Sequence, residues 1–210
     1  MIKILTKMIN TIMNDIHNRG LFITLYMNMS HFIGVLRGFW FKVIYSKNIK
    51  STIFSLQSNS SIEIFNKSSR LYIGKFAFIR KNASIRIDFN GLLTIGDKVF
   101  LNDNCTINCV KHISIGKFTK IGPNVSINDH DHNYKNQSNG HLVKGEVYIG
   151  ENVWIGSNVV IVRDTFIGDN AVIAAGSVVK GKVPANSLYL NKREPIIKPF
   201  TTGEKVREIL

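Results

Sequence analysis

Two histidines stand in a polar run that could carry out acid–base chemistry. His130 and His132 belong to the segment Asn128-Asp129-His130-Asp131-His132-Asn133-Tyr134. A neutral imidazole can accept a proton near neutral pH, and Asp129 or Asp131 could orient such a ring. The His-x-His spacing on a strand would also place both rings on one face, where they could bind a metal ion. A solvated turn that only begins a loop is the structural alternative.

The chain that follows these histidines repeats every six residues, and several repeats are marked by a following Gly or Ala. The repeated aliphatic positions are Ile149, Ile155, Ile161, Ile167, Ile173, Val179 and Ala185. A period of six fits neither an α-helix nor the simple alternation of a strand. It is typical of a parallel β-helix, in which each hexapeptide forms one short strand and one turn. The sequence therefore predicts an all-β fold.

The same period extends upstream, with interruptions. Three hexapeptides per coil predict about five coils, which begin near Ile73, Ile95, Ile115, Ile149 and Ile167. The period is interrupted after Ile85, Ile107 and Ile127, and the longest interruption, near 128–148, contains both histidines. We expect all three interruptions to project from the prism as loops, because insertions in repeat proteins often build the working face.

The composition predicts one principal domain with an appendage. We expect residues 1–50 to be a helical, aromatic-rich segment, 51–190 to be the β-helix, and 191–210 to be a C-terminal tail. The first region has neither the long uncharged apolar run of a spanning helix nor the features of a signal peptide. It could cap the open end of the β-helix, or it could rest as a basic amphipathic surface on a cytoplasmic membrane.

The formal net charge of +13 does not by itself predict a nucleic-acid partner. The basic residues are dispersed, without zinc-ligand spacing, a basic heptad region or an aromatic-basic RNA signature. A phosphorylated small cofactor or an anionic surface explains the charge equally well. The two cysteines, Cys105 and Cys109, do not form a disulfide framework, and we expect Cys105 to be a buried thiol.

Two segments resemble the hexapeptide-repeat O-acetyltransferases, which include the galactoside and maltose enzymes and those that acetylate capsule, O-antigen and exopolysaccharide sugars. They are Ile149–Ile161, which contains Val-Trp-Ile-Gly, and Ile167–Val179, which ends in Ala-Ala-Gly-Ser-Val-Val. The resemblance extends from Leu93 to Asn186. It implies a left-handed β-helix, a homotrimer, and an acetyl-CoA site in the groove between neighbouring prisms. It also implies that one histidine at the start of the protruding loop deprotonates the acceptor hydroxyl.

The resemblance also implies roles for individual residues. The spacing to Asn139-Gly140 and Trp154 favours His130 as the base, whereas the spacing from Ile127 favours His132. Asn102 would lie near the acceptor and the catalytic imidazole, although an ordinary turn explains it nearly as well. The residues expected near the thioester and pantetheine are Trp154, Ser157, Ala174, Ala175 and Gly176, and those expected near the phosphates are Lys180, Lys182 and Arg193. The structural alternative for the first set is tight packing of the coils, and for the second set it is a solvated surface.

The sequence thus predicts an acetyl-CoA-dependent O-acetyltransferase that needs no metal. Its expected acceptor is a sugar hydroxyl of a cell-surface polysaccharide or its precursor, in the cytoplasm or at the inner membrane face. Val110 stands where the galactoside enzymes place an acceptor-binding carboxylate, which argues against a galactoside of that kind. The alternatives are an amino-sugar N-acetyltransferase, a non-catalytic β-helix scaffold, and a β-helix carbonic anhydrase, whose histidine spacings this chain does not reproduce.

Overall fold

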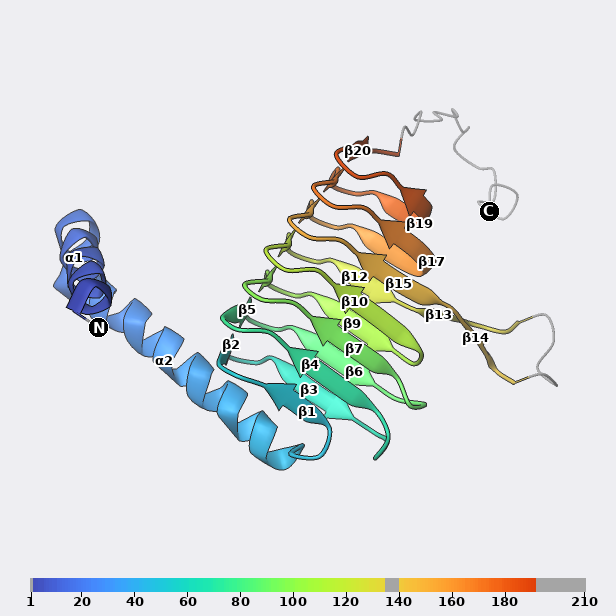
Figure 1. Ribbon diagram of the computed structural model, residues 1–210, viewed down its shortest axis with the longest axis horizontal. Coiled ribbons are helices and arrows are strands. Elements are labelled where there is room, and N and C mark those ends of the chain that lie inside the picture. The colour runs from blue at the N-terminus through green and yellow to red at the C-terminus, as the bar shows by residue number, and fades with distance from the viewer. Residues whose placement is uncertain (1, 135–139, 192–210) are drawn as a thin grey trace, which may run out of the picture.

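The computed structural model describes residues 2–134 and 140–191. Two helices, α1 (Ile2–Arg19) and α2 (Leu21–Ile44), precede a prism of stacked parallel strands, as Figure 1 shows. The prism is a left-handed parallel β-helix, so the β-helix predicted from the six-residue period and the left hand implied by the resemblance are both confirmed.

Each coil of the prism contributes one strand to each of three faces. The first face contains β1 (Ile49–Ser51), β4 (Arg70–Ile73), β7 (Leu92–Ile95), β10 (His112–Ile115) and β15 (Glu146–Ile149). The second face contains β2 (Phe54–Leu56), β5 (Ala77–Ile79), β8 (Phe100–Leu101), β11 (Lys120–Ile121), β16 (Trp154–Ile155), β18 (Val172–Ile173) and β20 (Leu188–Tyr189). The third face contains β3 (Ser61–Ile64), β6 (Ser84–Ile87), β9 (Thr106–Cys109) and β12 (Ser126–Asn128). The strands β17 (Val160–Ile167) and β19 (Val178–Val183) continue from the third face onto the first.

The core is a set of aliphatic columns that run along the prism. On the second face the paired register stacks Ile79, Leu101, Ile121, Ile155 and Ile173 on successive coils, and all five are buried. Neighbouring strands lie about 4.8 Å apart, so each of these side chains is covered by its equivalents on both sides. Because each coil has such an inward position on each of its three faces, aliphatic residues return every six positions within a coil.

The glycine that follows many of the stacked aliphatics is required by close approach of the backbone. A Cβ atom at Gly116 would lie 2.4 Å from the carbonyl carbon and oxygen of Gly150 on the next coil. No side chain can occupy that space unless the two coils separate. The Ile-Gly punctuation therefore marks a corner at which successive coils pack backbone against backbone.

At both ends the prism differs from the predicted repeat. It has six complete coils, one more than the period marks, because the coil 49–64 carries Ile49, Leu56 and Ile62 without the Ile-Gly punctuation. At the other end, the expectation that Ala185 continues the stack is wrong, since Val183 pairs with Ile167. The corner before Val183 is shorter than its equivalent in β17, and the strand register shifts there.

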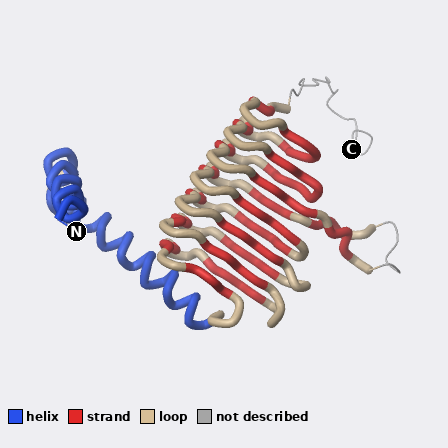
Figure 2. Tube along the Cα trace, viewed as in Figure 1, coloured by secondary structure: helices blue, strands red, loops and turns tan. Residues whose placement is uncertain are grey.

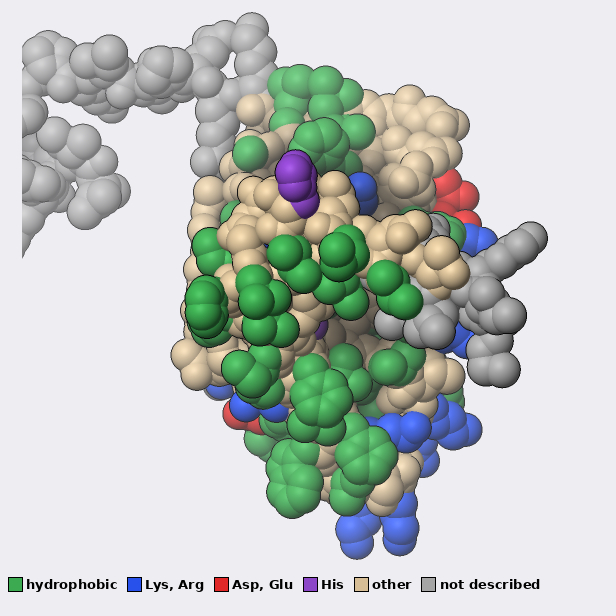
Figure 3. All heavy atoms as spheres, turned by 90° about the vertical axis from the view of Figure 1, so that its left-hand side faces the viewer, with side chains coloured by type: hydrophobic (Ala, Val, Ile, Leu, Met, Phe, Trp, Pro, Cys, Tyr) green, Lys and Arg blue, Asp and Glu red, His purple; other side chains and the backbone are tan. Residues whose placement is uncertain are grey.

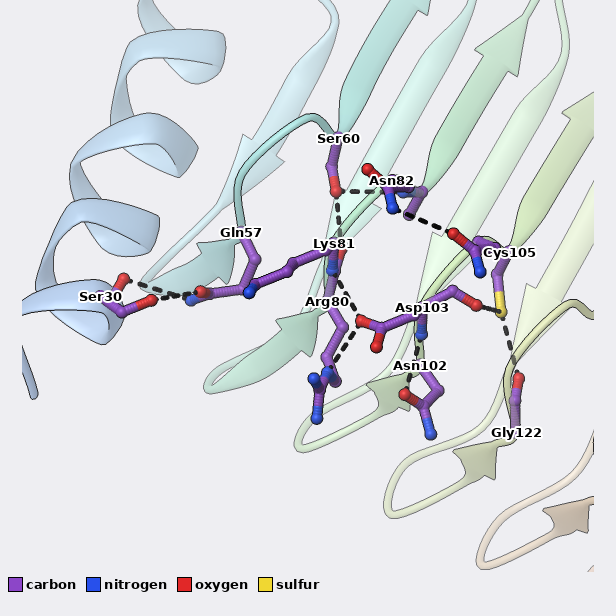
Figure 4. A network of polar contacts seen from close by, with 12 residues as sticks. Ser30, Gln57, Ser60, Arg80, Lys81, Asn82, Asn102, Asp103, Cys105 and Gly122 are labelled. Carbon is purple, nitrogen blue, oxygen red and sulfur yellow. Dashed lines mark hydrogen bonds and ion pairs between the residues drawn. The ribbon is translucent and has the colours of Figure 1, made fainter. Parts of the chain in front are cut away.

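Helix α2 lies against the first coil, while α1 extends away from the prism (Figure 2). Gly34 and Gly38 allow close contact with β2, because a Cβ at Gly38 would lie 2.8 Å from the carbonyl oxygen of Phe54. Phe41 packs against the apolar core from the same helix. The Ser30 hydroxyl donates a hydrogen bond of 3.0 Å to Gln57 Oε1 (Figure 4). Neither helix, as far as it is described, has an apolar stretch that could cross a bilayer.

We predict that Gly116→Ala destabilises the β-helix by roughly 1–3 kcal/mol, because the added methyl group forces two coils apart. Chemical denaturation followed by circular dichroism measures the change. Ser114→Ala, on the outer surface of β10 just before Gly116, is the matched control and should change stability by less than about 0.5 kcal/mol. Equal stability of the two variants would contradict the close-packing explanation.

Candidate active site

The interruptions of the repeat all lie at one edge of the prism, where the chain passes from the third face to the first face of the next coil. We call this edge the loop corner; its described residues are 65–69, 88–91, 110–111, 129–134 and 140–145. The last two segments form an antiparallel hairpin of β13 (His130–His132) and β14 (Leu142–Lys144), which projects from the prism in Figure 1. The prediction of projecting loops is confirmed for the interruptions after Ile85 and Ile127, and 65–69 adds another loop; the interruption after Ile107 is instead a two-residue turn in which Val110 is buried.

His130 lies at the base of this hairpin and contacts a buried carboxylate. Its Nδ1 atom is 3.0 Å from Oδ1 of Asp129, whose side chain is fully buried, whereas the His130 side chain is 20% exposed. A carboxylate only accepts hydrogen bonds, so this contact places the proton of a neutral imidazole on Nδ1. The Nε2 atom then carries the lone pair, which is the arrangement that a general base needs.

The Asp129 carboxylate is held by the neighbouring coil. Its oxygens accept hydrogen bonds from the backbone N–H groups of Val110, at 2.9 and 3.0 Å, and of Lys111, at 2.8 Å. These bonds satisfy a buried charge and fix its orientation. Burial, reinforced by the charge of Asp129, raises the pKa of the Cys109 thiol, so Cys109 stays protonated beside this carboxylate.

The second histidine has a different environment. His132 is exposed at the outer end of β13, where it pairs with Leu142 across the hairpin. Asp131, the other carboxylate that the sequence offered as an orienting group, instead forms an ion pair of 2.7 Å with Arg163. Of the two histidine–aspartate combinations, the structure therefore brings together His130 and Asp129.

A cavity of about 190 Å³ opens beside His130 at the loop corner. Besides His130, its walls include Phe65, Arg86, Phe89, Val110 and Leu142. Sequence reasoning did not identify Phe65, Arg86 or Phe89 as site residues. The ten-residue gap between Ile85 and Ile95 was the available signal, because Phe89 lies in the turn that this gap creates.

A different edge of the prism holds most of the residues that the resemblance assigned to the cofactor. We call this edge, between the second and third faces, the turn corner; it includes residues 102–105, 122–125, 156–159 and 174–177. Asn102 lies there and accepts a hydrogen bond of 2.8 Å from the backbone N–H of Asp103 (Figure 4). Ser157 and the run Ala174–Gly176 lie at this corner on successive coils, because Ile155 pairs with Ile173 on the second face. Trp154 lies beside it on β16 and is 64% exposed.

The predicted residues are therefore divided between two edges of one chain. Lys180 lies on β19 where that strand crosses the loop corner, and Lys182 pairs with Phe166 on the first face, so both are separated from Ala174–Gly176 by the third face. Arg193 lies outside the described residues. Trp154 is not among the described residues that line the cavity beside His130.

Two further histidines lie on or near the first face and the hairpin. His112 Nδ1 is 2.8 Å from the hydroxyl of Tyr148, and the ring of His141 lies edge-on to Phe89. The described residues contain no group of three or more His, Cys, Asp or Glu side chains arranged to hold a metal ion. Burial raises the pKa of the Cys105 thiol to about 11, and the expectation that this thiol is buried is confirmed.

Comparison with known proteins gives a consistent result. Residues 146–181 match the family model described as bacterial transferase hexapeptide (six repeats). The galactoside O-acetyltransferase of Escherichia coli (strain K12) is 33% identical over 162 residues, which cover 74% of this chain and 79% of that protein. A candidate lipopolysaccharide biosynthesis O-acetyl transferase of the same strain, WbbJ, is 32% identical over 129 residues, which cover 56% of this chain and 66% of WbbJ.

A solved structure supports the fold. The S84A mutant of AntD, an N-acyltransferase from Bacillus cereus in complex with dTDP-4-amino-4,6-dideoxyglucose and coenzyme A, aligns with a TM-score of 0.57 at 17% identity. The alignment covers 82% of this chain and 92% of AntD. Together with the sequence matches, the stacked hexapeptide coils show that this chain belongs to the hexapeptide-repeat acetyltransferases.

Proposed function

We propose that this protein transfers an acetyl group from acetyl-CoA to a sugar hydroxyl of a cell-surface polysaccharide, such as capsule, O-antigen or exopolysaccharide, or of its precursor. The observation that carries the proposal is the His130–Asp129 pair, in which a fixed carboxylate leaves Nε2 available at the wall of an open cavity. The similarity to a galactoside O-acetyltransferase and to WbbJ supports a saccharide acceptor.

In the proposed reaction, acetyl-CoA supplies a thioester whose carbonyl carbon accepts the sugar oxygen. His130 Nε2 removes the hydroxyl proton as that oxygen attacks, and Asp129 stabilises the imidazolium that forms. The imidazolium then returns the proton to the departing sulfur, so the base is regenerated. Acid–base catalysis of this kind typically contributes about 10²–10⁴-fold, and correct positioning of the two substrates can contribute more.

The turn corner provides residues suited to the acyl donor. Trp154 offers an exposed aromatic surface, while Ala174, Ala175 and Gly176 leave room for an extended pantetheine arm along the coils. Backbone N–H groups near Ser157 could stabilise the oxyanion. Because His130 lies at the other edge of the same chain, we propose that the complete site forms between subunits of a homotrimer. Lys180 and Lys182, on the His130 side, remain candidates for the phosphates.

The N-terminal helices have the chemistry of a membrane-contacting surface, and we propose that they place the enzyme at the inner membrane face. The side chains of Phe22, Tyr26, Phe32, Phe39 and Trp40 on α2 are largely exposed. Figure 3, viewed from the helix side, shows apolar side chains gathered there with lysines and arginines along one edge. Residues 1–50 carry seven Lys or Arg and one acidic residue, Asp15. Apolar burial and attraction to anionic lipid would act together.

An N-acetyltransferase is the second candidate, because AntD is an N-acyltransferase of the same fold. The two activities differ in their products, since an acetyl ester is cleaved by mild alkali whereas an acetamide is stable. A panel of neutral sugars and amino sugars, with alkali treatment of the products, separates them. Alkali-stable products formed only from amino sugars would favour the second candidate.

We predict that His130→Ala lowers kcat for acetyl transfer by about 10²–10⁴-fold, because the general base is lost. Thiol release from acetyl-CoA with a panel of surface sugars measures the rate. His132→Ala is the matched control and should retain activity within a few-fold of the wild type, since its ring is exposed. Full activity of His130→Ala would remove the proposed mechanism.

We predict that two inactive variants restore activity when they share a trimer. His130→Ala and Trp154→Ala damage opposite edges of the prism, so trimers that contain both variants should regain about one intact site in three if each site takes one edge from each of two neighbours. Co-expression with two affinity tags and assay of the doubly purified protein measures the recovery. A mixture as inactive as its parents would place both residues in the same half of the site.

We predict that the protein sediments with vesicles that contain anionic lipid and is released by high salt. Replacement of both Phe39 and Trp40 by Ser should reduce binding several-fold, because each ring buries apolar surface in the interface. Phe118→Ser, which alters an exposed ring on the prism, is the control and should bind as the wild type does. Equal binding of all three proteins would refute the role of α2.

A further inference from the structure

The cavity beside His130 extends along the prism across several coils. The strand register pairs Ile64 with Ile87 and Ile87 with Cys109, and it pairs Asn108 with Asn128. The residues that follow at the loop corner are therefore stacked on four successive coils, in the order Phe65, Asp88, Val110 and His130. Three strand spacings amount to roughly 14 Å, which is longer than a single pyranose ring.

Two exposed aromatic rings bound this cavity. Phe65 is 63% exposed and Phe89 is 43% exposed, although phenylalanine is usually buried. An aromatic ring offers a flat apolar surface that can pack against the C–H face of a pyranose ring. Arg86 lines the same cavity, and its guanidinium group can donate hydrogen bonds to sugar oxygens.

Phe89 has an unusual backbone conformation that two neighbouring groups stabilise. Its φ angle is 49°, a left-handed conformation that is unusual for a bulky residue. The backbone N–H of Phe89 donates a 2.7 Å hydrogen bond to Asp88 Oδ1, and Lys144 Nζ lies 4.4 Å from the centre of the Phe89 ring. Phe76 and Phe118 adopt the same region at other corners of the prism, so this angle belongs to the turn, and the contacts with Asp88 and Lys144 hold Phe89 in place.

We propose that the acceptor is a saccharide chain rather than a free monosaccharide, and that the loop corner holds two of its units. Phe89 stacks on the unit whose hydroxyl faces His130, and Phe65 stacks on the next unit, toward the N-terminal coils. The inference rests on the proposed acetyltransferase function and adds the length and orientation of its acceptor. Phe65 and Phe89 are thus specificity-determining residues for the reaction.

The test compares acceptors of different length. Methyl pyranosides of common surface sugars, the corresponding disaccharides and open-chain hexitols serve as probes, with the KM for each acceptor and for acetyl-CoA as readouts. We expect the wild type to favour disaccharides over monosaccharides and to use hexitols poorly. Phe65→Ala should raise the KM for disaccharides about ten-fold and leave that for monosaccharides unchanged.

The variants at Phe89 separate stacking from general packing. Phe89→Ala should raise the KM for both lengths of acceptor about ten-fold, Phe89→Leu should share this loss, and Phe89→Tyr should restore binding. The KM for acetyl-CoA should stay constant in all of them. Phe76→Ala is the matched control, because Phe76 has a φ angle of 59° and is 62% exposed but does not line this cavity.

The outcomes distinguish this inference from the function on which it rests. Acetyl transfer by the wild type with equal KM values for both lengths, or an unchanged disaccharide KM in Phe65→Ala, would overturn the two-unit site while leaving the enzyme an acetyltransferase. Absence of transfer to every sugar in the panel, together with no release of thiol, would count against the proposed function itself.

Discussion

Hydrogen bonding between successive coils is the constraint on which the rest of this structure depends. Parallel pairing places each residue about 4.8 Å above its equivalent in the preceding coil, so any position of the hexapeptide becomes a column along the prism. Aliphatic columns form the core, and glycine columns allow backbones to meet. Equivalent insertions gather at one edge. The contact of Asp129 with the backbone of Val110 and Lys111 belongs to the same stacking.

The division of the predicted site between two edges has a geometric origin. Trp154 lies on a strand of the second face and Ser157 follows that strand, whereas His130 follows a strand of the third, so the third face always separates them in one chain. A rigid solenoid cannot fold back on itself to bring such edges together. Lateral packing of prisms can bring the two edges together, so a site shared between subunits suits this fold.

The sequence predicted the repeating coils well and was less informative about the turns and loops that differ from coil to coil. Stacked aliphatics and their glycines specify the coils, because every rung imposes the same requirement. The coil 49–64 lacks glycine punctuation, and the short corner before Val183 shifts the register, so neither was predicted from the period. The choice of Asp129 over Asp131, and the meeting of Phe65 with Phe89 beside His130, depend on the paths of individual turns. Spacing alone does not encode those paths.

The concentration of every insertion at the loop corner has a consequence for divergence within the family. A segment anchored at both ends by paired strands can lengthen at little thermodynamic cost, since each doubling of loop length costs only about 0.6 kcal/mol of closure entropy. The hairpin 129–145 and the turn 88–91 can therefore vary while the aliphatic columns beneath them keep their register. Ligand recognition at this edge can therefore change, by evolution or by loop grafting, without changes in the residues that stabilise the coils.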